Sequence, residues 1–257
     1  MTDTNWLFIG TDPRLAMCSD MLSAKGFNSY HIGTDQYTEQ LGERLVALAP
    51  KHVVFPILQM KGTVPPEALA QGARLYTGVA SEEWLAPFKE AGFAVQPYLK
   101  DEQFIWQNAR LTAEAFVHVY YADMQRQIAG TSFAVAGFGK VGKATAHVLA
   151  SLGAQVMVIA RSAEQLGEAE ALQYETIQLT DDFHMEEGQL VNTIPAKWLS
   201  LSEASTLRVF DLASAPGCLK EHPSSEYYTI HLGLPGKHFP VDAAAALADA
   251  LERMYSR

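Results

Sequence analysis

The sequence predicts an α/β protein built from two doubly wound parallel-sheet domains, the second a Rossmann domain that binds a dinucleotide. Short apolar runs alternate with helical segments along the whole chain, which is typical of parallel sheets covered by helices. A glycine-rich turn joins a strand to a helix near residue 137. No repeat, low-complexity segment or flexible linker interrupts the pattern. We therefore expect an N-terminal flavodoxin-like or Rossmann-like substrate domain (1–107), a bridging helix with the nucleotide domain (108–238), and a C-terminal helix (239–257) that packs back on the first domain.

The glycine-rich turn lies in the stretch 131–153, TSFAVAGFGKVGKATAHVLASLG. Gly137 allows a tight turn, Gly139 lets the backbone approach a pyrophosphate, and Gly142 lets the helix pack closely on the strand. The N-terminus of the helix supplies N–H groups for the phosphates. A bare glycine pattern also occurs where only packing requires it, but the flanking strands and helix favour nucleotide binding. The predicted pyrophosphate-binding residues are Gly137, Phe138, Gly139, Lys140, Val141 and Gly142.

The end of the next predicted strand indicates which nucleotide binds. A site for NAD commonly places Asp or Glu there, to bind the ribose 2′-hydroxyl. This chain has Arg161 followed by Ser162. A guanidinium cannot accept a hydrogen bond but binds a phosphate well, and the serine hydroxyl offers a second donor. Although Arg161 could equally be a solvated loop residue, the pair favours NADP(H) as the cofactor.

Composition excludes several classes of function. The formal net charge is −10 with no run of Lys or Arg, which argues against binding to nucleic acid or to anionic membranes. No segment approaches the ~18 apolar residues of a membrane-spanning helix. The two cysteines, Cys18 and Cys218, have no metal-binding spacing and read as packing residues. Because no signal peptide is visible, we expect a cytoplasmic protein without a metal centre.

Each predicted element follows from local sequence. Asp12 before Pro13 is a strong helix start, and Gly26 ends that helix. In the first half we predict strands at 6–9, 27–32, 52–55, 74–77 and 93–97, and helices at 13–26, 40–48 and 81–91. A bridging helix is predicted at 109–128. In the second half we predict strands at 132–136, 156–160, 175–178, 189–193, 207–212 and 228–231, helices behind the glycine turn and at 163–172, a rigid turn at 232–236, and a final helix at 241–255.

Ligands of open parallel sheets bind beyond the carboxyl ends of the strands, and this rule selects a few loops. In the nucleotide domain the polar groups there suit the ribose and carboxamide of a dinucleotide, although capping of strand ends is an alternative role. These predicted cofactor-binding residues are Asn192, Thr193, Ile194, Pro195, Asp211, Leu212, Ala213 and Ser214. In the first domain the rule selects Thr11, Asp12, Arg14 and Gly78 as substrate-binding residues. Arg14 suits a substrate carboxylate, while Asp12 also reads as a plain helix cap.

The bridging helix offers candidates for catalysis. Glu114 lies in an otherwise apolar stretch, and a buried carboxylate with a raised pKa would be a suitable general acid or base. Thr112 lies two residues earlier, so the two side chains point in different directions. A hydrogen-bonded structural role for Glu114 is the alternative. His231 and His238 could also carry protons, but histidines near a turn are commonly packed or solvated.

Several of these motifs together resemble the A subunits of dipicolinate synthases, in family order over nearly the whole chain. The resemblance implies a two-domain NADP-dependent oxidoreductase that converts a dihydrodipicolinate-type substrate, a small dicarboxylate, to dipicolinate during sporulation. It also implies a partner, a flavoprotein-like B subunit, and it adds Leu234 and Pro235 to the substrate-binding residues. This chain departs from the family in having Ala215 where Arg is usual. The motifs are Gly10-x-Asp12-x-Arg14, Asn108-x-x-x-Thr112-x-Glu114, the glycine turn, Ala160-Arg161-Ser162, Asn192-Thr193-Ile194-Pro195, Asp211-Leu212-Ala213-Ser214-x-Pro216-Gly217 and Gly233-Leu234-Pro235-Gly236.

Two other functions remain open from the sequence. One is a 2-hydroxy-acid or amino-acid dehydrogenase of similar two-domain build. The other is an NADP-binding subunit without catalytic activity of its own, which the Ala215 departure keeps open. The apolar bridging helix also makes a homodimer plausible.

Overall fold

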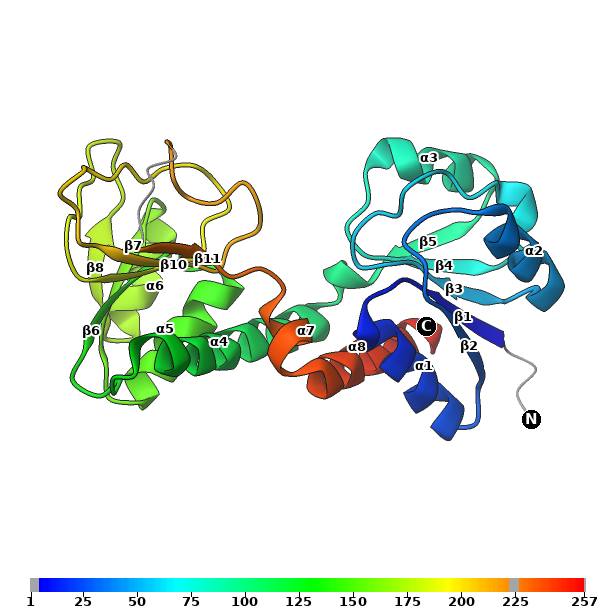
Figure 1. Ribbon diagram of the computed structural model, residues 1–257, viewed down its shortest axis with the longest axis horizontal. Coiled ribbons are helices and arrows are strands. Elements are labelled where there is room, and N and C mark those ends of the chain that lie inside the picture. Colours follow the sequence, from blue (N-terminus) through cyan, green and yellow to red (C-terminus); the bar gives the residue numbers. More distant parts are fainter. Residues whose placement is uncertain (1–4, 222–226, 257) are drawn as a thin grey trace. The chain divides into compact units, whose positions relative to one another are not determined.

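The structure, a computed structural model, describes residues 5–221 and 227–256. Residues 1–4 of the expected N-terminal domain and residue 257 lie outside this description, as do residues 222–226. The chain divides into two compact units, Met1–Asn108 with Phe239–Arg257 and Ala109–His238 (Figure 1). We call them the N-terminal unit and the nucleotide unit.

The N-terminal unit is built on a parallel five-stranded sheet in the order β2-β1-β3-β4-β5. The core has two layers, one on each side of this sheet. One layer packs the sheet against α1 and α8, and the other against α2 and α3, so the unit is doubly wound. The strands are β1 (Asn5–Ile9), β2 (Asn28–Ile32), β3 (His52–Val54), β4 (Arg74–Thr77) and β5 (Ala94–Pro97), and the helices are α1 (Pro13–Ala24), α2 (Glu39–Leu48), α3 (Glu82–Glu90) and α8 (Pro240–Tyr255), with short 3₁₀ turns η1 (Pro66–Ala68) and η2 (Tyr98–Lys100).

The nucleotide unit has a parallel six-stranded sheet in the order β11-β10-β9-β6-β7-β8. Counted from β8 within this unit, the order is that of the Rossmann fold, 3-2-1-4-5-6. The predicted fold class is therefore confirmed. The strands are β6 (Ser132–Ala136), β7 (Gln155–Ala160), β8 (Glu175–Gln178), β9 (Gln189–Asn192), β10 (Arg208–Asp211) and β11 (Tyr228–Ile230), and the helices are α4 (Glu102–Met124), α5 (Lys140–Ser151), α6 (Ala163–Ala171) and α7 (Leu234–His238).

The long helix α4 differs from the predicted bridging helix at both ends. It begins at Glu102 rather than 109, because the Asp101 carboxylate accepts a hydrogen bond from the Phe104 N–H, 2.9 Å away, and so caps the first turn. It ends at Met124, before Gln125, which has a left-handed φ of 50°. The helix therefore starts in the N-terminal unit and continues into the nucleotide unit, where Phe116 and Tyr120 pack on Phe133 and Phe210.

The rigid turn predicted at 232–236 is wrong in part, because a short helix, α7, begins within it. Gly233 has a φ of 68° and ends the extended segment, and α7 starts at the next residue. Pro235 is tolerated because N–H groups in the first helical turn have no intrahelical partner.

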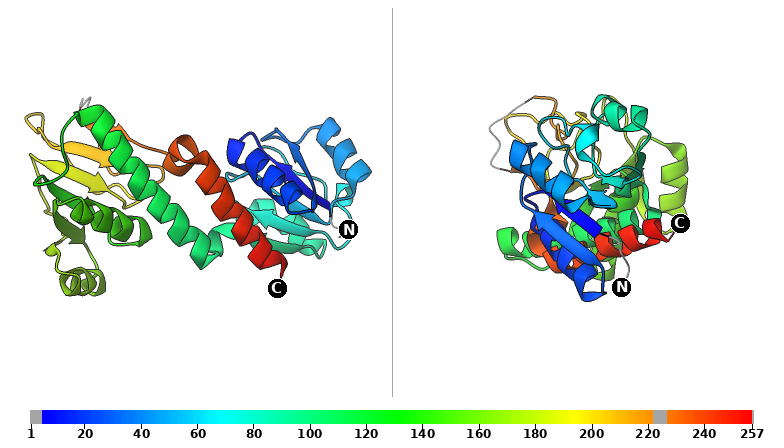
Figure 2. Two further views of the ribbon diagram at one scale, coloured as in Figure 1. Left: turned by 90° about the horizontal axis from the view of Figure 1, so that it is seen from below. Right: turned by 90° about the vertical axis from the view of Figure 1, so that its right-hand side faces the viewer.

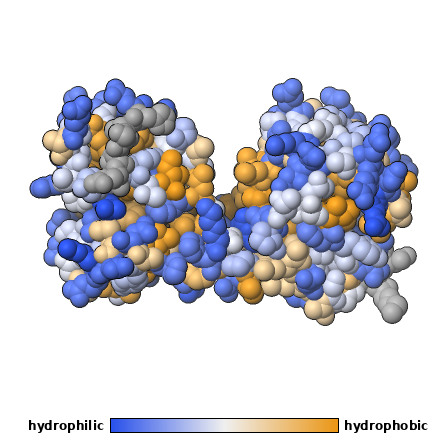
Figure 3. Space-filling model, viewed as in Figure 1, coloured by the Kyte–Doolittle hydropathy of each residue, from blue (hydrophilic) through white to orange (hydrophobic). Residues whose placement is uncertain are grey.

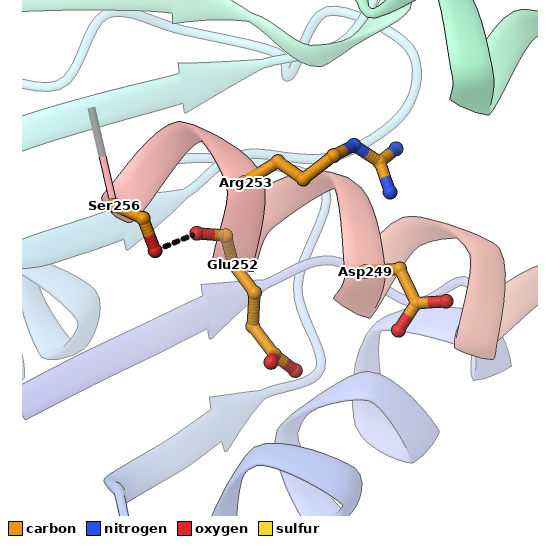
Figure 4. Close-up of a pocket in the computed structure, with 4 residues that line it drawn as sticks. All are labelled: Asp249, Glu252, Arg253 and Ser256. Atoms are coloured by element: carbon orange, nitrogen blue, oxygen red, sulfur yellow. Dashed lines mark hydrogen bonds between the residues drawn. The ribbon is translucent and has the colours of Figure 1, made fainter.

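Helix α8 is held on the N-terminal unit by packing and by two ion pairs. Its apolar side packs along α1, the neighbour seen beside it in Figure 2. Figure 4 shows Arg253 and Glu252 leaving the helix in different directions. Arg253 Nη2 lies 2.6 Å from Asp101 Oδ1, and Glu252 binds Lys25 beyond the end of α1. The pocket in Figure 4 is lined by Asp249, Glu252, Arg253 and Ser256, a set with two carboxylates that does not suit an acidic ligand.

The surface agrees with the composition. Hydrophilic residues cover much of the face seen in Figure 3, and apolar residues form patches on both units. Within the described residues, no helix combines the length and the apolar character that crossing a membrane requires.

Candidate functional site

The candidate dinucleotide site lies where the strand order of the second sheet reverses, between β6 and β9. The glycine turn follows β6, and Thr193 follows β9. The Thr193 hydroxyl donates to Ala136 O at 2.8 Å and lies 3.3 Å from Gly137 O, while the Thr193 N–H binds Ala136 O at 2.8 Å. The two loops are therefore fastened to each other at the reversal point.

The three glycines of the turn are required for three different reasons. Gly137 has a φ of 89°, and a Cβ there would lie 2.6 Å from Thr193 Oγ1. A Cβ on Gly142 would lie 2.0 Å from Gly137 O, so the helix could not approach the strand. A Cβ on Gly139 would meet nothing within 4 Å, and its φ of −78° suits any residue. Gly139 is therefore not required by the protein's own packing, and the open space beside it fits the close approach of a pyrophosphate.

The N-terminus of α5 can bind that pyrophosphate. Gly139 is its N-cap and offers no side-chain acceptor, so no capping side chain competes with an anion at the start of the helix. The Phe138 ring is buried and packs edge-on against Tyr174 at 6.0 Å, so only the backbone of Phe138 can contact a cofactor. Lys140 and Val141 form the first turn of α5. Lys143 Nζ is paired with Glu168 Oε1 at 2.7 Å, which connects α5 to α6.

Arg161 and Ser162 lie at the carboxyl end of β7. Arg161 is exposed, and Ser162 is the N-cap of α6. Ser162 Oγ accepts from the Gln165 N–H at 3.5 Å, which leaves its own proton free to be donated. The pair therefore presents a guanidinium and a hydroxyl donor beside a helix N-terminus, a set that fits a 2′-phosphate.

A buried carboxylate connects the end of β9, the loop after β10 and the start of β11. Asp211, which has no exposed surface, accepts from Asn192 Nδ2 at 2.7 Å and from the Ala213 N–H at 3.1 Å through Oδ1. Through Oδ2 it accepts from the Cys218 N–H and the Tyr228 hydroxyl, both at 2.7 Å. Burial, followed by the bond to Asp211, raises the pKa of the Tyr228 hydroxyl well above its usual range. Tyr228 therefore remains a neutral donor.

This network changes the interpretation of two predicted cofactor-binding residues. Asn192 is fully buried, and its Oδ1 accepts from the Ile194 N–H at 3.1 Å and from Trp198 Nε1 at 3.0 Å. The polar side-chain atoms of Asn192 and Asp211 are thus engaged in hydrogen bonds within the protein. Thr193 does the same with its hydroxyl, whereas Pro195 and Ser214 are exposed, Ile194 and Leu212 are half-buried, and Ala213 is buried.

The predicted substrate residues of the N-terminal unit lie near a second reversal of strand order, between β1 and β3. Asp12 caps α1 as predicted, and its carboxylate also holds Arg14, with Oδ1 to Nε at 2.9 Å and Oδ2 to Nη2 at 2.7 Å. Burial acts to raise the pKa of Asp12, but the hydrogen bonds and charge of Arg14 outweigh it and hold that pKa below its usual value. Thr11 binds the Asp35 carboxylate through its N–H, at 2.9 Å, and its hydroxyl.

Gly78 has a packing role that the sequence did not reveal. A Cβ there would lie 2.2 Å from Ile57 O, where the loops after β3 and β4 run side by side and the Val79 N–H binds Ile57 O at 2.8 Å. Leu234 and Pro235 are buried, so their side chains contribute to the packing of α7.

The expectation of a buried Glu114 is wrong. Its side chain is 42% exposed and pairs with Arg110 Nε at 2.9 Å, one helical turn earlier. The apolar neighbours that suggested burial lie on the other sides of α4. Thr112 is the buried member of the pair, with 7% exposed surface.

Three histidines, His118, His231 and His238, lie on or near α4 and α7. His231 follows β11 and stacks on Phe210 at 6.0 Å, and burial lowers its pKa. The rings of His238 and His118 lie 4.9 Å apart, and burial followed by the charge of His118 lowers the pKa of His238. Sequence reasoning missed His118, Trp198 and Tyr228. His118 and Tyr228 acquire their partners from other segments, and Trp198 meets Asn192 only through the path of the loop after β9.

Comparison with known proteins agrees with this description. Residues 102–196 match the family described as D-isomer specific 2-hydroxyacid dehydrogenase, NAD binding domain. The A subunit of dipicolinate synthase from Bacillus subtilis (strain 168) is 29% identical over 171 residues, which cover 62% of this chain and 57% of that protein. The match thus spans little more than half of that relative's length.

Two solved structures show the same fold. That of the dipicolinate synthase A subunit from Bacillus subtilis has a TM-score of 0.81 at 20% identity and covers 100% of this chain and 97% of its own. The corresponding A subunit from Bacillus halodurans has a TM-score of 0.76 at 21% identity, covering 99% and 98%. The 29% identical relative and the shared fold together confirm the predicted resemblance. Together with the matched family, it supports an oxidoreductase with an NAD(P)-binding domain.

Proposed function

We propose that this protein is an NADP-dependent oxidoreductase that converts a dihydrodipicolinate-type substrate to dipicolinate. The observation that carries the proposal is the glycine turn, where the space beside Gly139 is left open and the spaces beside Gly137 and Gly142 are filled. Arg161 and Ser162 support NADP over NAD, because a guanidinium and a hydroxyl donor recognise a phosphate. The name of the similar relative supplies the substrate class.

The residues of the chain would act mainly by binding and orienting. The first turn of α5 holds the pyrophosphate, Arg161 and Ser162 hold the 2′-phosphate, and the exposed Ser214 contacts the nicotinamide end of the cofactor. Arg14 and the N-terminus of α1 bind a substrate carboxylate. The bound nicotinamide supplies a hydride acceptor. The substrate ring loses one hydride and one proton, and it becomes aromatic. The proton leaves to water or to Glu114, and the buried Thr112, two residues earlier in α4, is the other candidate of that helix.

Calorimetry with NADP⁺ and NAD⁺ tests the cofactor part of the proposal. We expect the wild type to bind NADP⁺ at least tenfold more tightly than NAD⁺, because the 2′-phosphate adds a charge-assisted contact worth about 1.5–3 kcal/mol. Arg161→Ala should lose most of this preference. Arg126→Ala, which removes another exposed arginine of the nucleotide unit, is the matched control and should keep it. Equal affinities in wild type and Arg161→Ala would contradict the assignment of NADP.

A second candidate is an NADP-binding subunit that has no turnover alone. The observation that favours it is the Arg110–Glu114 pair, which leaves the predicted general base half-exposed. Oxidation of a dihydrodipicolinate-type substrate by the purified chain, followed at the NADPH absorbance, separates the two candidates. Turnover without any other protein excludes the second, and turnover only after addition of a flavoprotein-like B subunit supports it.

We further propose that the chain works with such a B subunit, since the relative is itself named as one subunit of a synthase, and that it forms a homodimer. Light scattering of the purified chain, alone and mixed with the B subunit, measures both associations.

A further inference from the structure

We propose that Asp211 and Tyr228 are positioning residues that shape the nicotinamide end of the cofactor site without touching the cofactor themselves. This inference rests on the proposed dinucleotide binding. It concerns the loop 212–217, which follows β10 and carries the exposed Ser214.

The first step is that the Asp211 carboxylate is fully used within the protein. It accepts four hydrogen bonds at distances between 2.7 and 3.1 Å, from donors on three different segments. A carboxylate has about four acceptor positions, so no strong one remains for a ligand. Because the residue is fully buried, loss of one donor would leave the oxygen it binds with a single hydrogen bond and no access to water.

The second step is that the donors hold both ends of the loop. The Ala213 N–H binds Oδ1 at the start of the loop, and the Cys218 N–H binds Oδ2 directly after its end. Both ends thus converge on one side chain. Their separation, and with it the course of the loop between them, is set by the size of the carboxylate.

The third step concerns Tyr228 in β11. Its hydroxyl donates to Asp211 Oδ2 and also sits against Gly217, where a Cβ would lie 2.5 Å from the hydroxyl oxygen. Gly217 has a φ of 82°, a conformation that glycine adopts freely. Tyr228 thereby fixes the end of the loop through the carboxylate and by direct contact. Asn192, at the end of β9, donates from Nδ2 to the same carboxylate.

The consequence is specific for one end of the cofactor. The network joins the end of β9, the loop after β10 and the start of β11, which lie on the far side of β6 from β7 and Arg161. In the proposed binding mode the adenosine half lies toward β7 and the nicotinamide half toward β9 and β10. Loosening the loop should therefore weaken the binding of a whole dinucleotide but not that of its adenosine half.

The experiment measures the affinities of NADP⁺ and of 2′,5′-ADP, which lacks the nicotinamide half, for the full chain and for Tyr228→Phe and Asp211→Asn. For Tyr228→Phe we expect about a tenfold loss of NADP⁺ affinity, because small displacements of positioning groups have large effects on the groups they hold, and no change for 2′,5′-ADP. Asp211→Asn should show a larger loss, since its amide places a donor against the donors of the loop. Tyr98→Phe, which removes a buried hydroxyl bound to Phe55 O in the N-terminal unit, is the control for a general loss of stability.

The outcomes separate the inference from the function on which it rests. Unchanged NADP⁺ affinity in Tyr228→Phe overturns the inference alone, and so does an equal loss for both ligands, which would indicate a merely structural role. If the wild type binds neither ligand, the proposed function fails and the inference fails with it. Should Asp211→Asn not fold, Tyr228→Phe still decides the question, because the Cys218 N–H continues to satisfy Oδ2.

Discussion

The glycine turn allows one prediction that separates cofactor binding from folding. Gly139→Ala adds a methyl group that meets no protein atom within 4 Å, at a φ that alanine readily adopts. Alanine is a poorer N-cap than glycine, which destabilises the folded state by about 0.5–1 kcal/mol. Alanine also restricts the unfolded chain, which raises the unfolding free energy by about 0.4–1 kcal/mol and so offsets this loss. The free energy of unfolding should therefore change by less than about 1 kcal/mol. The new methyl group occupies the space proposed for the pyrophosphate, so NADP⁺ affinity should fall at least tenfold, or about 1.4 kcal/mol.

Gly142→Ala should behave in the opposite way. Its Cβ would lie 2.0 Å from the backbone oxygen of Gly137, which no side-chain rotation can relieve. We expect a loss of about 2–3 kcal/mol in unfolding free energy, as for other overpacked sites. Gly167→Ala in α6, where a Cβ also meets nothing within 4 Å, is the control: it should leave NADP⁺ affinity unchanged and raise the unfolding free energy by about 0.5–1 kcal/mol, because alanine is the better helix former. The assays are urea unfolding followed by circular dichroism, and calorimetry with NADP⁺. Wild-type affinity in Gly139→Ala would refute the reasoning.

Three further predictions concern charged groups. Burial, followed by the charge of Arg74, lowers the pKa of His52 to about 4 from 6.5. On acidification His52 is therefore protonated in the unfolded chain before it is protonated in the folded one, and the unfolding free energy falls as the pH drops from 6.5 to 4. The loss between pH 7 and 5 should be about 2 kcal/mol by urea unfolding, and His52→Asn should show less pH dependence in that window. Arg253→Met removes the ion pair with Asp101, whose side chain is 5% exposed, and should lower the unfolding free energy by about 2 kcal/mol. Arg253→Lys keeps the positive charge and should lose less stability. Glu114→Gln should change the unfolding free energy by less than about 0.5 kcal/mol, because half-exposed i,i+4 pairs contribute little to stability. A larger loss would show a structural role for Glu114.

The elements and their order were predictable because the signals that define them are local. Asp12 and Ser81 cap the helices predicted to follow them, and the strands 74–77 and 175–178 begin and end where the sequence places them. Helix α4 is the instructive exception. Its true start depends on the Asp101 carboxylate, which caps the helix and also binds Arg253, a residue 152 positions away. A cap that is shared with a distant partner gives no clear local signal.

The candidate site was predictable to a lesser degree, because polar side chains can serve either the ligand or the protein. The strand-end rule selected Asn192 and Asp211 as candidates, but it could not assign their hydrogen bonds. Their partners are set by the path of the loop that carries Trp198 and by the start of β11, where Tyr228 lies. Glu114 shows the same limit. Its apolar neighbours along the sequence suggested burial, whereas the side chain points to a partially exposed side of α4 and meets Arg110.

The Asp12–Arg14 pair has a consequence for the recognition of a dicarboxylate. Arg14 Nε and Nη2 are already bound to a carboxylate of the chain, and that carboxylate is held in its charged form by the same contact. In the proposed function, a substrate carboxylate at the start of α1 would therefore meet a pair with little net charge rather than a free cation. Recognition of the carboxylate would then depend on the N–H groups in the first turn of α1 and on the remaining guanidinium nitrogen of Arg14. These contacts select a ligand by its shape as much as by its charge. Such a site suits a rigid planar dicarboxylate better than a flexible one, because a rigid ligand loses less conformational entropy when it binds.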